Sequence, residues 1–213
     1  MKDPFDYSLI QDYLTTLIPP RPAILREMEE YAEQHNFPII GPVVGQLCYQ
    51  VARMIGAKNI FELGSGFGYS TAWFARAVQE NGGGLVHHTV WDDELSRMAQ
   101  EHLSRLGYSN LVRFHNAEAV QTLRETPGPF DIIFNDIDKE AYPDSLPLIK
   151  ENLRPGGVLI IDNMLWHGRI FDTSDTANST EGVRRFTQTI TTDPDWIVTL
   201  LPLRDGVIVA YKK

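Results

Sequence analysis

The feature that most constrains the fold is an alternation of strand-like and helix-like segments through the middle of the chain. Short strand-like runs occupy residues 60–63, 85–90, 111–115, 130–135 and 158–161. Stretches with helical spacing separate them, at about residues 70–80, 93–106, 117–124 and 140–152. This alternation is typical of a parallel sheet covered by helices on both faces. We therefore predict an α/β fold.

The N-terminal part is expected to be helical. Residues 6–17 and 23–35 carry apolar positions at helical spacing, and the Pro19-Pro20 pair separates the two segments. A further helix is predicted over residues 43–55, directly before the first strand. Residues 1–42 are thus interpreted as a helical N-terminal extension of the α/β fold.

The C-terminal part departs from the alternation. Two β-rich runs at residues 196–201 and 207–211 are joined by a five-residue turn, which is a hairpin signal and leaves no room for a crossover helix. An antiparallel strand is therefore expected at the end of the sheet. The polar segment 172–181 has little to bury, and we expect a mobile lid there.

Composition restricts the class of protein. The 213 residues, 43% hydrophobic, suffice for one domain over 1–213 with a full core. A formal charge of −9, from 28 acidic against 19 basic residues, favours small substrates over long nucleic acids. The single cysteine, Cys48, excludes an intramolecular disulfide, and neither a signal-peptide core nor an apolar run of roughly 20 residues is present. We expect a cytoplasmic protein that does not enter a membrane.

A glycine-rich loop over residues 61–70 follows the first strand and opens a helix. Its glycines, Gly64, Gly66 and Gly68, would let the backbone approach a ligand at the helix N-terminus. The dinucleotide fingerprint requires a further glycine where Tyr69 stands, which disfavours NAD or FAD. The loop is instead similar to the first motif of S-adenosylmethionine-dependent methyltransferases. A tight turn without a ligand is the alternative, although packing alone rarely demands three glycines so close together.

Charged and amide side chains follow two apolar strands. Asp136, Asp138 and Lys139 come after residues 130–135, and Asp162 with Asn163 after residues 158–161. Such groups are expensive to desolvate unless they bind something, and the carboxyl ends of parallel strands are where α/β proteins hold ligands. Carboxylate and amide oxygens suit Mg²⁺, Mn²⁺ or Ca²⁺ better than zinc. The pattern predicts a divalent-metal site.

Taken together, these motifs resemble those of the cation-dependent O-methyltransferases, the family that includes caffeoyl-CoA and catechol O-methyltransferases. The likeness runs from Pro38 to the C-terminus. Its pieces, in order, are IIGPVVGQL, ELGSGFGYS, FDIIFNDIDKEAY, LRPGGVLIIDNMLWHG and LPLRDGVIVAYK. The resemblance implies the Rossmann-like class I methyltransferase fold, with a mostly parallel seven-stranded sheet and an antiparallel C-terminal strand. Relatives of this kind are usually homodimers.

The resemblance also implies roles for particular residues. Asp136, Asp162 and Asn163 would be the metal ligands, and Lys139, three residues after Asp136, would be the general base. A lysine can act so only where burial and nearby positive charge lower its proton affinity. The alternative for Lys139 is a plain salt bridge to Asp136 or Asp138.

The sequence departs from the family at the cofactor's ribose. Val90 stands where relatives usually carry an acid that holds both ribose hydroxyls, and Asp92 or Asp93 would have to replace it. Asn116 stands where an aspartate often meets the adenine, and its amide oxygen can accept the same hydrogen bond. The expected cofactor-binding residues are Glu62, Gly64, Ser65, Gly66, Gly68, Tyr69, Ser70, Asp92, Asn116, Ala117 and Asp138.

The resulting prediction is an enzyme that uses S-adenosylmethionine and a divalent cation to methylate a hydroxyl of a small, catechol-like aromatic acceptor. Bacterial relatives also methylate a hydroxylated uridine in tRNA, which is a second hypothesis that the acidic net charge disfavours. A third is a non-catalytic binding protein that kept the fold after cofactor recognition decayed at Val90. The intact set of Asp136, Lys139, Asp162 and Asn163 counts against decay.

Overall fold

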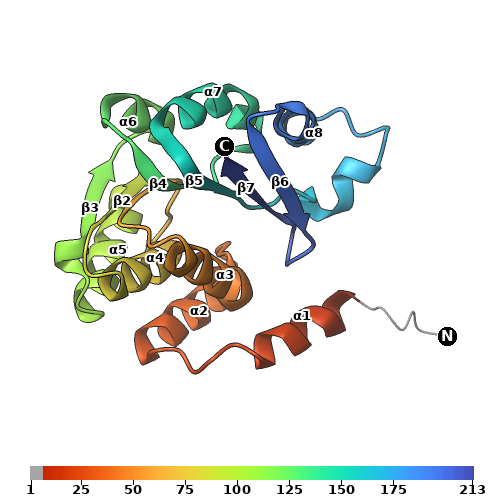
Figure 1. Ribbon diagram of the computed structural model, residues 1–213. Coiled ribbons are helices and arrows are strands. Elements are labelled where there is room, and N and C mark those ends of the chain that lie inside the picture. Colours follow the sequence, from red (N-terminus) through yellow and green to blue (C-terminus); the bar gives the residue numbers. More distant parts are fainter. Residues whose placement is uncertain (1–6) are drawn as a thin grey trace.

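One seven-stranded sheet forms the centre of the molecule (Figure 1). It is seen in a computed structural model that describes residues 7–213. The strands are β1 (Asn59–Leu63), β2 (Leu85–Val90), β3 (Val112–Asn116), β4 (Phe130–Asn135), β5 (Leu153–Ile161), β6 (Trp196–Leu201) and β7 (Val207–Lys212). Their order across the sheet is β3-β2-β1-β4-β5-β7-β6.

The predicted strand directions are confirmed. Strands β1 to β5 pair in parallel, whereas β7 pairs antiparallel with both β5 and β6, so that β7 alone runs against the other six. The chain leaves β1 for β2 and β3 on one side and returns to β4 and β5 on the other. The order therefore reverses between β1 and β4, and the carboxyl ends of strands at such a point form a crevice for a ligand.

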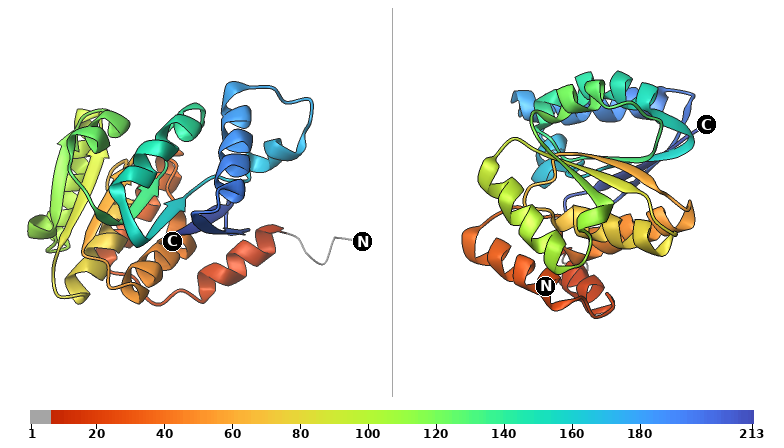
Figure 2. Two further views of the ribbon diagram at one scale, coloured as in Figure 1. Left: turned by 45° about the horizontal axis from the view of Figure 1, so that its top comes forward. Right: turned by 90° about the vertical axis from the view of Figure 1, so that its left-hand side faces the viewer.

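Helices cover both faces of this sheet. They are α1 (Tyr7–Thr16), α2 (Ala23–His35), α3 (Gly41–Met54), α4 (Tyr69–Glu80), α5 (Asp93–Arg105), α6 (Ala119–Glu125), α7 (Tyr142–Asn152) and α8 (Asn178–Thr192). Short 3₁₀ turns occur at Ser109–Leu111, Lys139–Ala141 and Trp166–Phe171. Helices α6, α7 and α8 lie on one face, and α3, α4 and α5 lie on the other, with α2 outside them (Figures 1 and 2).

The two faces of the sheet build two separate cores, because successive strand residues point to opposite sides. In β4, Ile132 and Phe134 pack with the core under α3 and α4, whereas Ile133 packs with the core under α7 and α8. All three side chains are fully buried. Burial of each such side chain contributes about 1.5–3 kcal/mol, so the acids that follow β4 are held on a rigid strand.

Helix α8 takes up the last four residues of the polar segment 172–181, in which we expected a mobile lid. The helix begins at Asn178, within that segment, and buries Val183, Phe186 and Ile190 against the sheet. The turn before it is also fixed, because the Arg184 guanidinium donates to the backbone oxygens of four residues: Arg169, Ile170, Asp172 and Asp175. The segment therefore consists of a mostly exposed turn held by Arg184, followed by the first turn of a packed helix.

The predicted N-terminal helices correspond to α1 and α2, although residue 6, where we expected the first helix to begin, lies outside the described residues. Helix α1 has no buried residue. Polar contacts to the turn between β6 and β7 hold it: the Tyr7 hydroxyl donates to the oxygen of Pro202 at 2.8 Å, and the Gln11 side chain accepts from the backbone N–H of Arg204 at 3.0 Å. Within residues 7–213, no helix combines the length and apolarity needed to cross a membrane.

Candidate functional site

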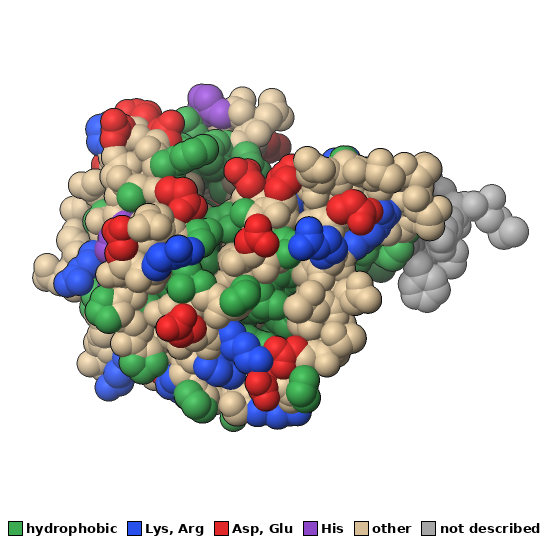
Figure 3. Space-filling model, turned by 90° about the horizontal axis from the view of Figure 1, so that it is seen from above, with side chains coloured by type: hydrophobic (Ala, Val, Ile, Leu, Met, Phe, Trp, Pro, Cys, Tyr) green, Lys and Arg blue, Asp and Glu red, His purple; other side chains and the backbone are tan. Residues whose placement is uncertain are grey.

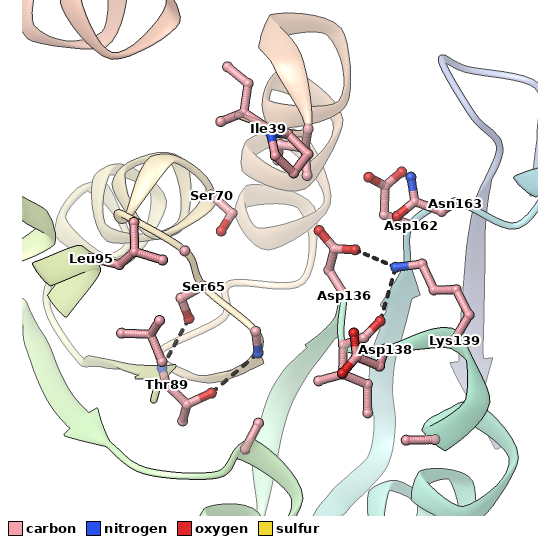
Figure 4. A pocket seen from close by; sticks show the side chains of 18 of the residues that line it. Ile39, Ser65, Ser70, Thr89, Leu95, Asp136, Asp138, Lys139, Asp162 and Asn163 are labelled. Atoms are coloured by element: carbon pink, nitrogen blue, oxygen red, sulfur yellow. Dashed lines mark hydrogen bonds and ion pairs between the residues drawn. The ribbon is translucent and has the colours of Figure 1, made fainter. Parts of the chain in front are cut away.

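A cleft of about 770 Å³ opens at the carboxyl ends of the parallel strands. It extends from the glycine loop after β1, past the end of β2, to the acidic residues after β4 and β5 (Figure 4). Eleven of the residues expected at the site line it, namely Gly64, Ser65, Gly66, Tyr69, Ser70, Ala117, Asp136, Asp138, Lys139, Asp162 and Asn163. Four others do not, namely Glu62, Gly68, Asp92 and Asn116.

Glycine is required in the loop at one close approach. Gly64 has a φ of +83°, and a Cβ built on it would lie 2.6 Å from the backbone oxygen of Asp136. A side chain would therefore clash with the start of the acidic segment as well as strain the backbone. The loop and the Asp136 segment are packed directly on each other, which brings the two predicted motifs into one site.

The glycine loop is fastened to β2 through Thr89. The Ser65 N–H donates to the Thr89 backbone oxygen at 2.9 Å. The Thr89 N–H donates back to the Ser65 hydroxyl at 3.0 Å, as Figure 4 shows. The Thr89 hydroxyl in turn donates to the backbone oxygen of Glu62. These bonds fix the loop in the shape that lines the cleft. Thr89 itself lines the cleft and was not among the expected site residues.

Glu62 supports the loop from below. Its side chain is fully buried, and its carboxylate accepts a hydrogen bond from the Thr71 hydroxyl. Burial raises the pKa of Glu62 to about 7, although hydrogen bonds from the hydroxyls of Ser70, Thr71 and Ser65 favour the charged form. Because Glu62 does not line the cleft, the structure does not support its expected contact with a cofactor.

Tyr69, at the start of α4, joins the cleft to the N-terminal helices. Its hydroxyl donates to the Glu29 carboxylate at 2.7 Å, and Glu29 also pairs with Arg21 at 2.7 and 2.9 Å. Burial, followed by this hydrogen bond, raises the pKa of Tyr69. Helix α2 thus helps to form the site by fixing one of its aromatic walls.

The segment after β4 positions Asp136 and Lys139 together. The Lys139 ammonium donates to the Asp136 carboxylate at 2.9 Å and to the Ile137 oxygen at 3.0 Å. It also lies 4.9 Å from the centre of the Tyr142 ring. Lys139 is only 7% exposed, and α8 approaches its backbone so closely that a Cβ on Gly182 would lie 2.2 Å from the Lys139 oxygen.

Asp162, after β5, is almost wholly enclosed. It is 1% exposed, and its Oδ1 has no hydrogen-bond partner among the described residues. Burial and the nearby charge of Asp136 raise its pKa to about 7, while the Arg204 guanidinium, 2.8 Å from Oδ2, acts in the opposite direction. Asp162 lines the cleft, and an enclosed carboxylate with an unpartnered oxygen is suited to bind a cation.

Asn163 takes a backbone conformation that turns it into the same cleft. Its φ is +59°, a left-handed conformation that asparagine tolerates better than most residues. The Asp205 carboxylate accepts from the Asn163 amide nitrogen at 3.3 Å and from the His167 N–H at 2.6 Å. Asp205, which is 8% exposed, therefore holds the amide nitrogen of Asn163 and leaves the amide oxygen of Asn163 for other partners.

These side chains fit a hard divalent cation. Asp136, Asp162 and Asn163 supply carboxylate and amide oxygens from two adjacent strand ends and lie near one another in Figure 4. Within residues 7–213 there is no cluster of three or more His, Cys, Asp or Glu arranged to hold a metal, so the donor set depends on the amide of Asn163. Mg²⁺ and Mn²⁺ accept such oxygen sets and keep positions for further oxygen ligands.

The opposite end of the cleft differs from the expectation for the ribose. The Asp92 carboxylate caps α5 by accepting from the Leu95 N–H at 2.9 Å, and Asn116 donates its amide to Asp93. Neither Asp92 nor Asn116 lines the cleft, so the geometry does not support their expected contacts with a cofactor. Apolar Val90 lines the cleft instead, together with Glu118, whose carboxylate accepts from two N–H groups at the start of α6.

The sheet order, the glycine loop and the cleft at the carboxyl ends of the strands define a class I methyltransferase. A family model described as O-methyltransferase matches residues 19–213. The chain therefore belongs to the O-methyltransferase family, and it is an S-adenosylmethionine-dependent enzyme of the caffeoyl-CoA and catechol type.

Relatives and solved structures agree with this membership. The chain is 34% identical to a catechol O-methyltransferase of Niastella koreensis over 151 residues, which are 69% of this chain and 67% of the relative. It is 26% identical to caffeoyl-CoA O-methyltransferase 2 of Populus trichocarpa over 96% of this chain and 88% of the relative. An O-methyltransferase from Bacillus cereus, solved in complex with SAH, superimposes with a TM-score of 0.86 at 28% identity, covering 96% and 97% of the two chains.

Proposed function

We propose that this protein transfers a methyl group to one of two adjacent hydroxyls on a small aromatic ring and that it requires a divalent cation to do so. The observation that carries the proposal is the enclosed Asp162, with its unpartnered oxygen, beside Asp136 and Asn163 in the cleft that contains the glycine loop. Two neighbouring hydroxyls can chelate one cation, and a single hydroxyl cannot. The relatives named as catechol and caffeoyl-CoA O-methyltransferases support the same acceptor class.

The residues of this chain divide the work between the two ends of the cleft. The glycine loop, from Gly64 to Ser70, would hold the sulfonium cofactor. Asp136, Asp162 and Asn163 would hold the cation at the other end. A divalent cation bound there would acidify an acceptor hydroxyl and fix its orientation, and orientation of this kind can contribute about 7–11 kcal/mol in favourable cases.

In this proposal Lys139, which lines the cleft beside Asp136, takes the proton of the acceptor. Its amine, once free of its own proton, would receive the hydroxyl proton as the oxygen attacks the methyl carbon. A new bond then forms between oxygen and carbon, the bond between carbon and sulfur breaks, and the sulfur keeps the electron pair. Trp166, whose ring centre lies 5.7 Å from the Lys139 ammonium, lines this end of the cleft and can shield the reaction from water.

A hydroxylated uridine in tRNA is the second candidate acceptor, and the surface charge seen in Figure 3 disfavours it. On the face shown in Figure 3, Lys and Arg side chains are interspersed with Asp and Glu rather than gathered into a basic patch. The net charge of −9 acts in the same direction. An RNA-binding enzyme needs a positive surface to offset the phosphates of its substrate. The mixed charge on this face therefore favours the small acceptor.

The metal requirement is tested by transfer assays with purified protein. Methyl transfer from S-adenosylmethionine to a panel of catechols should stop when EDTA is added and resume when Mg²⁺ or Mn²⁺ is restored. Asp162→Asn should lose activity, and added Mg²⁺ or Mn²⁺ should not restore it, because one of the proposed ligating carboxylates is gone. Undiminished transfer in excess EDTA would refute the metal role.

The role of Lys139 is tested by Lys139→Met, which removes the amine and keeps an unbranched side chain. Turnover should fall by about two orders of magnitude or more, the usual contribution of a general base, while the affinity for S-adenosylhomocysteine stays unchanged. Lys58→Met, at an exposed position beside the amino end of β1, is the matched control. Equal loss of turnover and cofactor affinity would mean that Lys139 is only a structural partner of Asp136.

A further inference from the structure

We propose that the Arg204 guanidinium competes with the divalent cation for the Asp162 carboxylate. The inference rests on the proposed metal site and adds a residue that lowers the affinity of that site for its ion. Arg204 stands in the turn between β6 and β7, 42 residues away from Asp162 in sequence. No role at the site was assigned to it from the sequence.

The contact itself is direct. Arg204 Nη1 donates to Asp162 Oδ2 at 2.8 Å, and the Arg204 side chain lines the cleft. Asp162 is 1% exposed, so water cannot screen the pair from its side, whereas the Arg204 side chain is 33% exposed. The guanidinium therefore binds a nearly dry carboxylate yet keeps a route toward solvent.

Charge balance at the site explains why the guanidinium competes with the ion. Each of the two carboxylates has one monovalent partner: Lys139 is 2.9 Å from Asp136, and Arg204 is 2.8 Å from Asp162. These two single charges together equal the charge of one divalent ion. A divalent ion that binds both carboxylates would lie within a few ångströms of the guanidinium, and the repulsion between them would be strong in this buried place. Arg204 occupies Oδ2 and leaves Oδ1 without a partner, so the two cations would compete through their repulsion, and the ion would bind most tightly when Arg204 leaves Asp162.

The backbone of Arg204 is fixed even though its side chain can move. The Arg204 N–H donates to Gln11 of α1 at 3.0 Å, and the Tyr7 hydroxyl donates to the oxygens of Pro202 and Arg204 itself. On the other side of the turn, a Cβ on Gly206 would lie 2.5 Å from Leu165. For the guanidinium to leave Asp162, only the flexible side chain beyond a fixed Cα would have to swing toward solvent.

The test is calorimetric titration of Mg²⁺ and Mn²⁺ into the full-length protein with S-adenosylhomocysteine bound, without any turnover. Arg204→Met should bind either ion about tenfold more tightly than the wild type, because one charge-assisted hydrogen bond no longer has to be broken. Arg97→Met removes the same charge from an exposed pair with Glu94 on α5 and should leave ion affinity unchanged. Arg204→Lys keeps a charge with fewer donors and should fall between the wild type and Arg204→Met.

The outcomes separate this inference from the proposed function. Equal affinity in the wild type and Arg204→Met, with binding lost in Asp162→Asn, would overturn the competition and leave the metal site standing. Binding in no variant would overturn both. Tighter binding in Arg204→Met, or binding that appears only there, supports the competition. Circular dichroism and cofactor titration report whether each variant folds, and if Arg204→Met does not, the comparison of Arg204→Lys with the wild type decides in the same way.

Discussion

The buried acid under the glycine loop should make stability depend on pH. Burial raises the pKa of Glu62 from 4.5 to about 7. A carboxyl whose pKa is higher in the folded state holds its proton better there, so its contribution to stability is complete below about pH 4.5 and is lost as the pH rises through about 7. Each pKa unit corresponds to about 1.4 kcal/mol, so the whole interval amounts to about 3 kcal/mol of unfolding free energy.

Glu62→Gln should remove this dependence, because the amide has nearly the same shape and does not ionise. The free energy of unfolding of the wild type should fall by about 3 kcal/mol more than that of Glu62→Gln between about pH 5 and pH 8. Urea unfolding followed by circular dichroism at each pH, in the presence of a chelator, measures both curves. The raised pKa of Asp162 produces a slope of the same sign in both proteins and cancels in their difference.

Glu30→Gln is the matched control, since it removes the same charge from an exposed position on α2. Its curve should follow that of the wild type. Parallel curves for the wild type and Glu62→Gln would refute the reasoning, because they would mean that Glu62 holds its charge in the fold at no cost. A wild type that becomes more stable as the pH rises, relative to Glu62→Gln, would reverse the sign and refute it as well.

Three further outcomes are expected. Gly64→Ala should lose cofactor binding in a calorimetric titration, because an added Cβ would clash at 2.6 Å with the neighbouring backbone, whereas Gly82→Ala, also at positive φ but in open space, should retain it; equal behaviour would contradict the packing argument. Val90→Glu should bind S-adenosylhomocysteine about tenfold more tightly if it restores an acceptor for the ribose, and unchanged or weaker binding would mean that the ribose lies elsewhere. We also propose a homodimer that covers exposed apolar side chains of α1. Replacing both Leu9 and Tyr13 by Glu should then give a monomer in light scattering, and a wild type with the mass of one chain would contradict the proposal.

The central strands could be predicted from sequence because they are buried on both faces. The segment 130–135 has four apolar residues out of six, and β4 spans those residues. The segment 85–90 has only three, at Leu85, Val86 and Val90, but β2 spans it and buries five of its six residues. Helix starts were less accurate: α6 begins at Ala119 rather than at residue 117, because the side chain of Glu118 accepts the first free N–H groups and caps the helix there.

Helix α8 was missed although a signal was present. Val183, Phe186 and Ile190 are spaced by three and four residues, as on one face of a helix. Threonines and a glycine lower the local helix propensity and masked that spacing. Several of these threonine hydroxyls donate to the carbonyl four residues before, for example Thr187 to Val183 at 2.9 Å. Packing against the sheet therefore decided the conformation, and propensity did not.

The acidic end of the site could be anticipated, and the ribose end could not. Residues directly after parallel strands must meet at one edge, which is why Asp136 and Asp162 were expected together and why both line the same cleft. Asp92 directly precedes α5, where an aspartate commonly caps a helix, and the cap took its carboxylate away from the cleft. Arg204 depends on where a distant hairpin turn is docked, and no local pattern encodes that contact.

Gly182 allows α8 to approach the backbone of Lys139, so this helix helps to set the position of the proposed base. A Cβ there would lie 2.2 Å from the carbonyl oxygen of Lys139, so the helix packs directly against the backbone of the proposed base. Any larger residue at position 182 would push the Lys139 backbone away from α8 and move the Lys139 amine away from the hydroxyl of the acceptor. Directed evolution for new acceptors therefore has to leave position 182 as glycine, although this residue does not itself line the cleft.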